Sequence, residues 1–257
     1  MGALRRDFLP EDLRLEIQPP DVDGVISVQA RQSVEETNWL LALAAQHDWI
    51  EGIVGWLPLA DPNIREIMDQ FQHEKKLLGL RHVVQDEVND GFLSNAEFNR
   101  GIAAMKEFGW TYDLLIYDRQ LPFAIPFVDR HPKQVFVLDH IAKPTIQSGE
   151  PDSVWQRDFR ELAQRPNVYC KFSGVVTEVR ALEWNVQLLQ KYWDTAIEAF
   201  GSDRLMFGSD WPVCLLKSTY LDWADAVSVL AGGLSANEQA NFWSANAKRA
   251  YRLALTT

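Results

Sequence analysis

The feature that most constrains this chain is a repeat of short apolar runs separated by longer segments with helical periodicity. The runs are rich in Val, Ile, Leu or aromatic residues and lie at residues 24–29, 52–57, 77–84, 111–116, 134–140, 168–173 and 204–210. Continuous apolar runs of this length are typical of strands that are buried on both faces. Strands that alternate strictly with helices predict a parallel sheet.

Helix-start patterns fall between these runs. Ser33 with Glu36, and Ser94 with Glu97, have the spacing of capping boxes. The strand ends recur roughly every 30 residues, the length of one strand–helix unit. No linker rich in Pro, Gly or Ser divides the chain, so we expect one domain over residues 1–257.

Seven strands are one fewer than a closed barrel of this type requires. A (β/α)8 or TIM-barrel-like fold needs eight strands, and residues 4–20 suggest a loop and a short helix rather than the first strand. A doubly wound open sheet holds seven strands without strain, but no glycine-rich phosphate loop follows any run. We therefore predict a (β/α)8-type barrel that lacks its first strand. Lowered stability is expected, because an opened barrel exposes two strand edges.

Charge and cysteine content narrow the classes of partner. The net charge of −11 argues against nucleic acid and anionic membrane surfaces. No apolar run approaches the ~20 residues that cross a bilayer, and the basic start is not followed by the apolar segment of a signal peptide. Cys170 and Cys214 fit neither a disulfide framework nor a zinc spacing. We expect a cytoplasmic setting, and a homo-oligomer is compatible with the sequence.

Polar residues gather where the predicted strands end, which is where parallel barrels carry their chemistry. They are Gln29, Arg31, Trp56, Arg81, His82, Tyr112, Asp113, Asp139, His140, Lys171, Ser173 and Asp210. Asp210 is a candidate general base or metal ligand, with a turn-forming role as the alternative. His140 suits substrate binding, carbonyl polarisation or metal ligation. Its alternative is a satisfied core histidine, which Asp139 would orient.

Two further strand positions carry charge. Successive strand residues point to opposite faces, so at most one of Arg81 and His82 faces the barrel interior. An arginine there suits a substrate carboxylate or a developing oxyanion, and the alternative is a salt bridge along the rim. Lys171 interrupts an apolar strand, where a charge is costly unless paired. We therefore expect Lys171 to be functional or bridged to Asp210, with a purely structural pair as the alternative.

Two segments in the second half of the chain carry a family resemblance. VLDHIAKP at 137–144 and FGSDWPVC at 207–214 together resemble the sugar-lactonase branch of the amidohydrolase superfamily. Shorter matches lie at 28–32, 80–86 and 169–174. Fuconolactonases and rhamnonolactonases are the similar families, and pyrone-dicarboxylate lactonases are more distant. The resemblance implies that His140 is the strand-six histidine and Asp210 the strand-eight aspartate.

The chain departs from this family at its beginning. Family members typically open with a strand ending in His-x-His, which is absent here. A catalytic zinc usually has three protein ligands, whereas His140 and Asp210 supply two. We therefore expect no required cofactor, with zinc held by these two residues as the alternative. Because residues 4–13 resemble interior family sequence, we expect the first strand to be encoded upstream of Met1, with true loss as the alternative.

The resemblance implies hydrolysis of a sugar-acid lactone, a small-molecule substrate. Asp210 would take a proton from water, and His140 with Arg81 or Lys171 would stabilise the oxyanion. The expected substrate-binding residues are Gln29, Arg31, Trp56, Arg81, His82, Tyr112, Lys171 and Trp211. For the two tryptophans the alternative is packing under loops. The alternative functions are a decarboxylase of an unsaturated acid and an impaired fragment that binds sugar acids. The lactonase hypothesis requires that His140 and Asp210 point into a common cavity.

Overall fold

The computed structural model describes residues 2–18, 22–147, 149–180 and 182–253. The strands are β1 (Val25–Val28), β2 (Ile50–Gly55), β3 (Leu77–Val83), β4 (Thr111–Leu115), β5 (Phe136–Leu138), β6 (Val168–Phe172) and β7 (Leu205–Phe207). Each lies at a predicted position, and most are slightly shorter than the run that predicted them. The runs outlast β5 and β7 because His140 and Asp210 adopt positive φ and leave the sheet.

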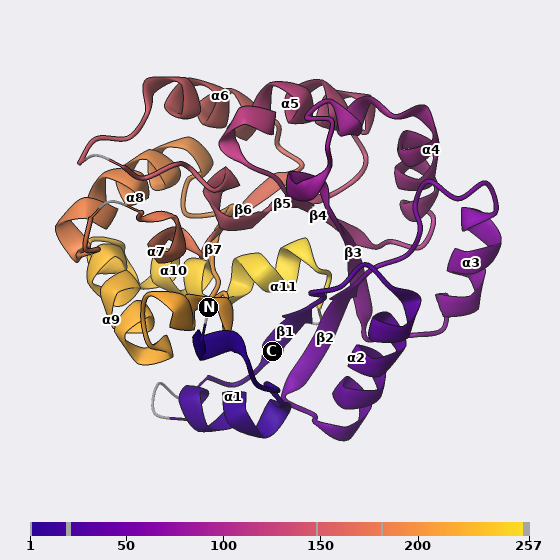
Figure 1. Ribbon diagram of the computed structural model, residues 1–257, viewed down its shortest axis with the longest axis horizontal. Helices are drawn as coiled ribbons and strands as arrows, with labels where there is room; N and C mark the ends of the chain where they lie inside the picture. Colours follow the sequence, from indigo (N-terminus) through magenta and orange to yellow (C-terminus); the bar gives the residue numbers. More distant parts are fainter. Residues whose placement is uncertain (1, 19–21, 148, 181, 254–257) are drawn as a thin grey trace.

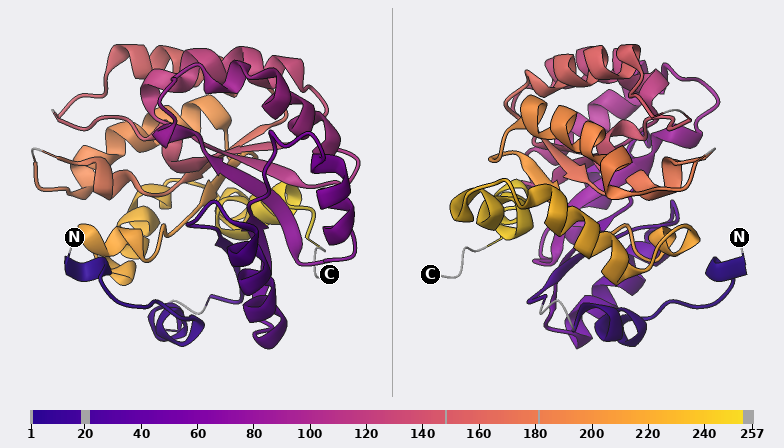
Figure 2. Two further views of the ribbon diagram at one scale, coloured as in Figure 1. Left: turned by 45° about the vertical axis from the view of Figure 1, so that its right-hand side comes forward. Right: turned by 90° about the vertical axis from the view of Figure 1, so that its left-hand side faces the viewer.

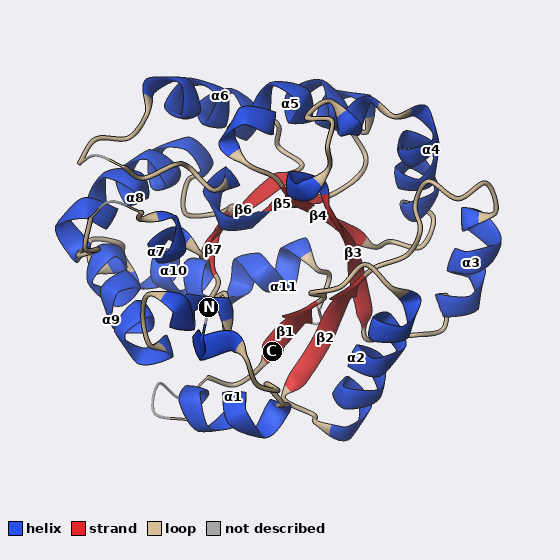
Figure 3. Cartoon of the chain, viewed as in Figure 1, coloured by secondary structure: helices blue, strands red, loops and turns tan. Residues whose placement is uncertain are grey.

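The strands pair in parallel, in chain order from β1 to β7, and curl around a central space (Figures 1 and 3). Within the described ranges no backbone pairing joins β7 to β1, so the barrel is open along one side. The predicted TIM-barrel-like α/β fold, with seven of its eight strands, is confirmed. Helix α11 (Asn246–Ala250) and the short turn at Gly2–Leu4 lie on opposite faces of this half-barrel (Figure 2).

Helices cover the outside of the curled sheet (Figure 1). The outer helices include α2 (Val34–Gln46), α3 (Ile64–Phe71), α4 (Ala96–Met105), α5 (Leu121–Arg130), α6 (Ser153–Ala163), α8 (Val186–Phe200) and α9 (Tyr220–Ala231). The other helices are α1 (Pro10–Ile17), α7 (Val175–Glu178), α10 (Ala236–Ala240) and α11, which crosses the middle of the ring of strands in Figure 1. The short helix predicted before the first strand is α1, whereas Pro19 and Pro20 lie outside the described residues. Of the helices described, none has the length and apolar character needed to cross a membrane.

One of the two predicted helix starts is displaced by a residue. The Ser33 hydroxyl accepts the backbone N–H of Glu36 and caps α2, as predicted. At α4 the cap is Asn95 instead of Ser94, because the Asn95 side-chain oxygen accepts two backbone N–H groups of the first turn, including that of Glu97. A short amide side chain at the N-cap satisfies donors that the helix itself leaves unpaired.

Alternate strand residues face the helices or the barrel interior. The layer between sheet and helices contains the main core, whereas the interior holds a smaller apolar cluster of Val54, Val137, Met206, Ala250 and Tyr251. The Thr111 hydroxyl donates to the carbonyl oxygen of Ala250 at 2.6 Å. This contact places α11 beneath the amino end of β4 and directs the following Tyr251 into the interior.

Candidate active site

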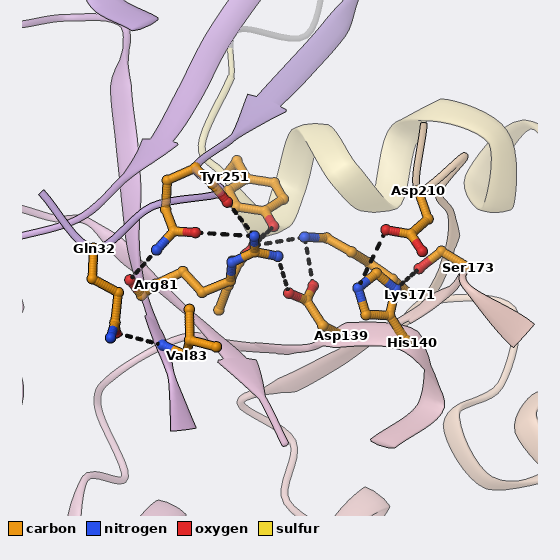
Figure 4. A network of polar contacts seen from close by, with 11 residues as sticks. Gln32, Arg81, Val83, Asp139, His140, Lys171, Ser173, Asp210 and Tyr251 are labelled. Carbon is orange, nitrogen blue, oxygen red and sulfur yellow. Dashed lines mark hydrogen bonds and ion pairs between the residues drawn. The ribbon is translucent and has the colours of Figure 1, made fainter. Parts of the chain in front are cut away.

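His140 and Asp210 come together at the carboxyl ends of their strands. His140 lies two residues beyond β5 and Asp210 three residues beyond β7. Nε2 of the histidine is 3.6 Å from Oδ1 of the aspartate, and the two side chains point toward each other (Figure 4). They are 70 positions apart in the sequence, and the fold brings them side by side at one end of the sheet. This separation is longer than a direct hydrogen bond, so the imidazole Nε2 and the carboxylate can each still form a hydrogen bond to a bound molecule.

Left-handed backbone positions these side chains. His140, Ile141, Ala142 and Lys143 all have positive φ, between 47° and 61°, and Asp210 has φ 54°. Such values are costly for residues with a Cβ and concentrate at functional sites. The turn closes through a 2.8 Å hydrogen bond from the Lys143 N–H to the His140 carbonyl oxygen. The buried Trp155 indole donates to the Ile141 carbonyl oxygen at 3.0 Å and holds the turn from α6.

The His140 ring is buried and bonded on its second nitrogen. Nδ1 lies 2.8 Å from the hydroxyl of Ser173, which follows β6. Burial lowers the pKa of His140, and the charges of Lys143 and Arg81 act in the same direction, against those of Asp210 and Asp139. The imidazole is therefore neutral near pH 7. A neutral ring offers one N–H donor and one acceptor.

A buried charge network forms the floor beneath this pair. Arg81 donates to Asp139 at 2.8 Å, and Lys171 lies 2.7 Å from Asp139 (Figure 4). Lys171 also lies 2.6 Å from Asp113. The Tyr251 hydroxyl donates to Asp113 at 2.8 Å. Two cations thus face two carboxylates that are completely buried. Pairing of this kind is what makes buried charge tolerable.

The charges of the floor control one another's protonation. Burial raises the pKa of Asp139, but Lys171 and Arg81 outweigh burial and hold it below its usual value. Burial raises the pKa of Asp113 to about 6, although Lys171 opposes the shift. Burial alone would lower the pKa of Lys171, but the two carboxylates raise it well above normal. The lysine therefore stays protonated.

Two predicted pairings are wrong. Lys171 does not bridge Asp210, because its ammonium group is paired with Asp113 and Asp139, whereas Asp210 lies beyond the end of β7. Asp139 does not orient the His140 ring, because its carboxylate is occupied by Arg81 and Lys171. Ser173 bonds the ring instead.

His82 and Trp56 lie on the helix side of the sheet. As predicted, only one residue of the Arg81–His82 pair faces the interior, and it is Arg81. His82 stacks on Phe92, accepts from the Trp56 indole at 3.3 Å and lies 2.6 Å from Glu87. A separate cavity of about 210 Å³ is lined by Trp56, Pro58, Leu59, Ala60, Asp61, His82, Phe92 and Phe98. These two residues line that cavity together, and His140 is not among its lining residues.

The substrate-binding role predicted for Tyr112 does not fit its position. Its side chain is fully buried in the aromatic layer between β4 and the helices, against Phe98, Phe127 and Phe136. The strand alternation places its neighbour Asp113 in the interior instead. A side chain without solvent access cannot contact a substrate at the mouth.

The remaining predicted binding residues differ in their surroundings. Gln29 is buried and accepts from Arg81 at 3.1 Å, so it belongs to the floor. Arg31 is exposed on the loop after β1, and its backbone N–H donates to Glu36. Trp211, directly after Asp210, is half-buried and packs edge-to-face on Phe8 at 5.2 Å.

Besides Ser173, three contributors to the site were given no specific role from the sequence. Asp113 shares with Lys171 the pattern of a charge within an apolar strand, and that pattern would have indicated a pair. Gly174 has φ 65° and lies against both His140 and Asp210. Tyr251 carries no local sequence pattern that indicates its role, because only tertiary folding brings it to Asp113.

The donors at the site do not make a tight metal centre. A catalytic zinc usually has three protein ligands. Within the described ranges no group of three or more His, Cys, Asp or Glu side chains is arranged to hold an ion. His140 can offer only Nε2 beside Asp210, since Nδ1 is bonded to Ser173. These residues do not fit a firmly held zinc ion.

A parallel half-barrel that presents a histidine and an aspartate at the carboxyl ends of its strands defines the class of a barrel hydrolase. The Amidohydrolase family profile matches residues 2–253. The chain therefore belongs to the amidohydrolase family, as its resemblance predicted.

Individual relatives agree with this membership. The chain is 39% identical to L-fucono-1,5-lactonase of Burkholderia multivorans, over 98% of this chain and 88% of that protein. Identity to L-fucono-1,5-lactonase of Burkholderia ambifaria is 32%, over 87% of this chain and 76% of that protein. Crystal structures of a Burkholderia multivorans amidohydrolase, one with bound HEPES and one with bound zinc, match with TM-score 0.94 and 39% identity. Each of these matches covers 99% of this chain and 92% of the chain in the crystal structure.

Proposed function

We propose that this protein hydrolyses a sugar-acid lactone, with a substrate of the L-fucono-1,5-lactone type. The observation that carries the proposal is the approach of His140 Nε2 to Asp210 Oδ1 at 3.6 Å, at the mouth of the half-barrel. The names of the relatives described above support the substrate class.

The two side chains divide the chemistry between them. Asp210 takes a proton from water while the water oxygen bonds to the lactone carbonyl carbon. The N–H of neutral His140 donates to the carbonyl oxygen as it becomes negative. The ring C–O bond then breaks, and the leaving alkoxide takes the proton from Asp210. The product is an open hydroxy acid, which ionises in solution.

Arg81 and Lys171 have an indirect role in this mechanism, as parts of the charge network beneath the His140–Asp210 pair. Both are engaged by Asp139 and Asp113, so they do not reach freely toward a substrate. The charge of Arg81 helps to keep the imidazole neutral, and the ion pairs of both cations hold the floor together. This assignment replaces the oxyanion role predicted for them from the sequence.

The test is turnover of a panel of aldonolactones, followed by acid release with a pH indicator. Asp210→Asn should lower kcat by about 100-fold or more, because general-base catalysis typically contributes that much. Asp194→Asn, an exposed change on α8, is the matched control and should leave kcat unchanged. The proposal is rejected if no aldonolactone is turned over, or if Asp210→Asn retains near-normal kcat.

A further inference from the structure

The Ser173 hydroxyl has a single partner. Ser173 is buried directly after β6, and its Oγ lies 2.8 Å from His140 Nδ1 (Figure 4). It makes no other hydrogen bond within the part of the chain that the structure describes. A buried hydroxyl that is committed to one ring nitrogen must either accept its proton or donate to its lone pair.

Electrostatics decides between these two arrangements. The charged groups that face the His140 ring are Asp210, Asp139, Lys143 and Arg81. The Asp210 carboxylate lies on the Nε2 side, at 3.6 Å. A lone pair on Nε2 would point at this negative charge, whereas an N–H there is attracted to it. The proton of the neutral ring therefore belongs on Nε2, and Nδ1 carries the lone pair that Ser173 must satisfy.

The position of Ser173 is fixed by its surroundings. A Cβ at Gly208 would lie 2.8 Å from Ser173 Cβ and 3.1 Å from its Oγ, so only a glycine leaves room on that side. The serine is thus held between the bare backbone of Gly208 and the His140 ring. A confined hydroxyl loses little rotamer freedom when it donates, which favours a persistent hydrogen bond.

We propose that Ser173 is a positioning residue that donates to Nδ1 of His140 and so fixes the ring as the Nε2–H tautomer. The catalytic part of this inference rests on the proposed lactonase function, in which Nε2–H is the donor to the lactone carbonyl oxygen. The opposite tautomer would present a lone pair to that oxygen and would repel it. Ser173 therefore controls the rate without contacting the substrate.

Nitrogen-15 NMR of the histidine side chains tests the tautomer directly. The protein has five histidines, and His140→Asn identifies the resonances to be followed. In the wild type, Nε2 should have the shift of a protonated ring nitrogen and Nδ1 that of an acceptor. In Ser173→Ala, both nitrogens should move toward intermediate shifts. A wild-type spectrum with the proton on Nδ1 would overturn the proposal.

Kinetics separate positioning from general structural damage. Ser173→Ala should lower kcat by about 10- to 100-fold, as loss of an orienting partner typically does, with little change in KM. Ser173→Cys, a weaker donor of similar size, should fall between wild type and Ser173→Ala and serves if the alanine variant does not fold. Thr195→Ala removes a buried hydroxyl from α8 and should keep the wild-type kcat.

The two proposals fail in different ways. Retention of both the wild-type tautomer and the wild-type kcat in Ser173→Ala would refute the role of Ser173 alone. If no lactone is turned over, the NMR result still decides the tautomer, and only the proposed function is rejected.

Discussion

Gly174 offers a direct test of how the site is assembled. It follows Ser173 with φ 65°, and a Cβ at this position would lie 2.9 Å from His140 Nδ1 and 3.0 Å from Asp210 Oδ2. Gly174→Ala therefore adds a methyl group in close contact with both proposed catalytic side chains. It also places a residue with a Cβ in the left-handed region.

The two effects have different magnitudes and different readouts. Left-handed backbone costs a non-glycine residue about 1–2 kcal/mol, so the free energy of unfolding should fall by about that much. The contacts near 3 Å force His140 or Asp210 to move by a few tenths of an ångström. Misplacement on this scale lowers rates by up to about 100-fold, so kcat for the lactone should drop by more than 10-fold.

Gly201→Ala is the matched control. Gly201 has φ 66° and ψ 174°, a backbone region essentially restricted to glycine, so alanine should cost at least as much unfolding free energy there. No described heavy atom lies within 4 Å of its added Cβ, so kcat should stay at the wild-type value. Urea unfolding and initial rates, measured in one buffer, compare the two variants. Equal losses of kcat in both would refute the collision argument, as would a normal rate in Gly174→Ala.

Three further predictions concern the floor, the turn and the imidazole. Lys171→Met should lower the free energy of unfolding in urea by about 3–5 kcal/mol, because it leaves buried carboxylates without their cation. Adding Asp113→Asn should recover part of this loss. An unchanged unfolding midpoint in Lys171→Met would contradict the pairing. Trp155→Phe should cost about 1–3 kcal/mol and lower kcat, because the Ile141 carbonyl oxygen loses its donor; stability and rate equal to wild type would argue against this. Burial lowers the pKa of His140 below its usual 6.5. The unfolded chain therefore takes up this proton first, and the contribution of His140 to stability is lost as pH falls below 6.5. An NMR titration midpoint above 6.5 would be inconsistent with that.

The strand positions were predictable because their signal is local. Each buried strand is a continuous apolar run, and its polar end falls where parallel barrels carry their chemistry. The meeting of His140 with Asp210 follows from that rule and the family motifs. Neither the strand positions nor this meeting requires knowledge of which side chains touch across the barrel.

Partners inside the barrel were not predictable in the same way. The face to which a residue points depends on strand register, and a shift of one residue exchanges Tyr112 for Asp113. The partner of Lys171 depends on its level along β6 relative to β4 and β5, which no single strand specifies. Tyr251 comes from another part of the chain altogether.

The contact between Tyr251 and Asp113 links the site to the order in which the chain is made. These residues are 138 positions apart, and Thr111 holds Ala250 across a similar interval. A nascent chain can pair its early strands as they leave the ribosome, but Asp113 lacks its tyrosine until residue 251 has followed. Until then a buried carboxylate is one donor short, so this part of the interior is completed only after residue 251 has been made.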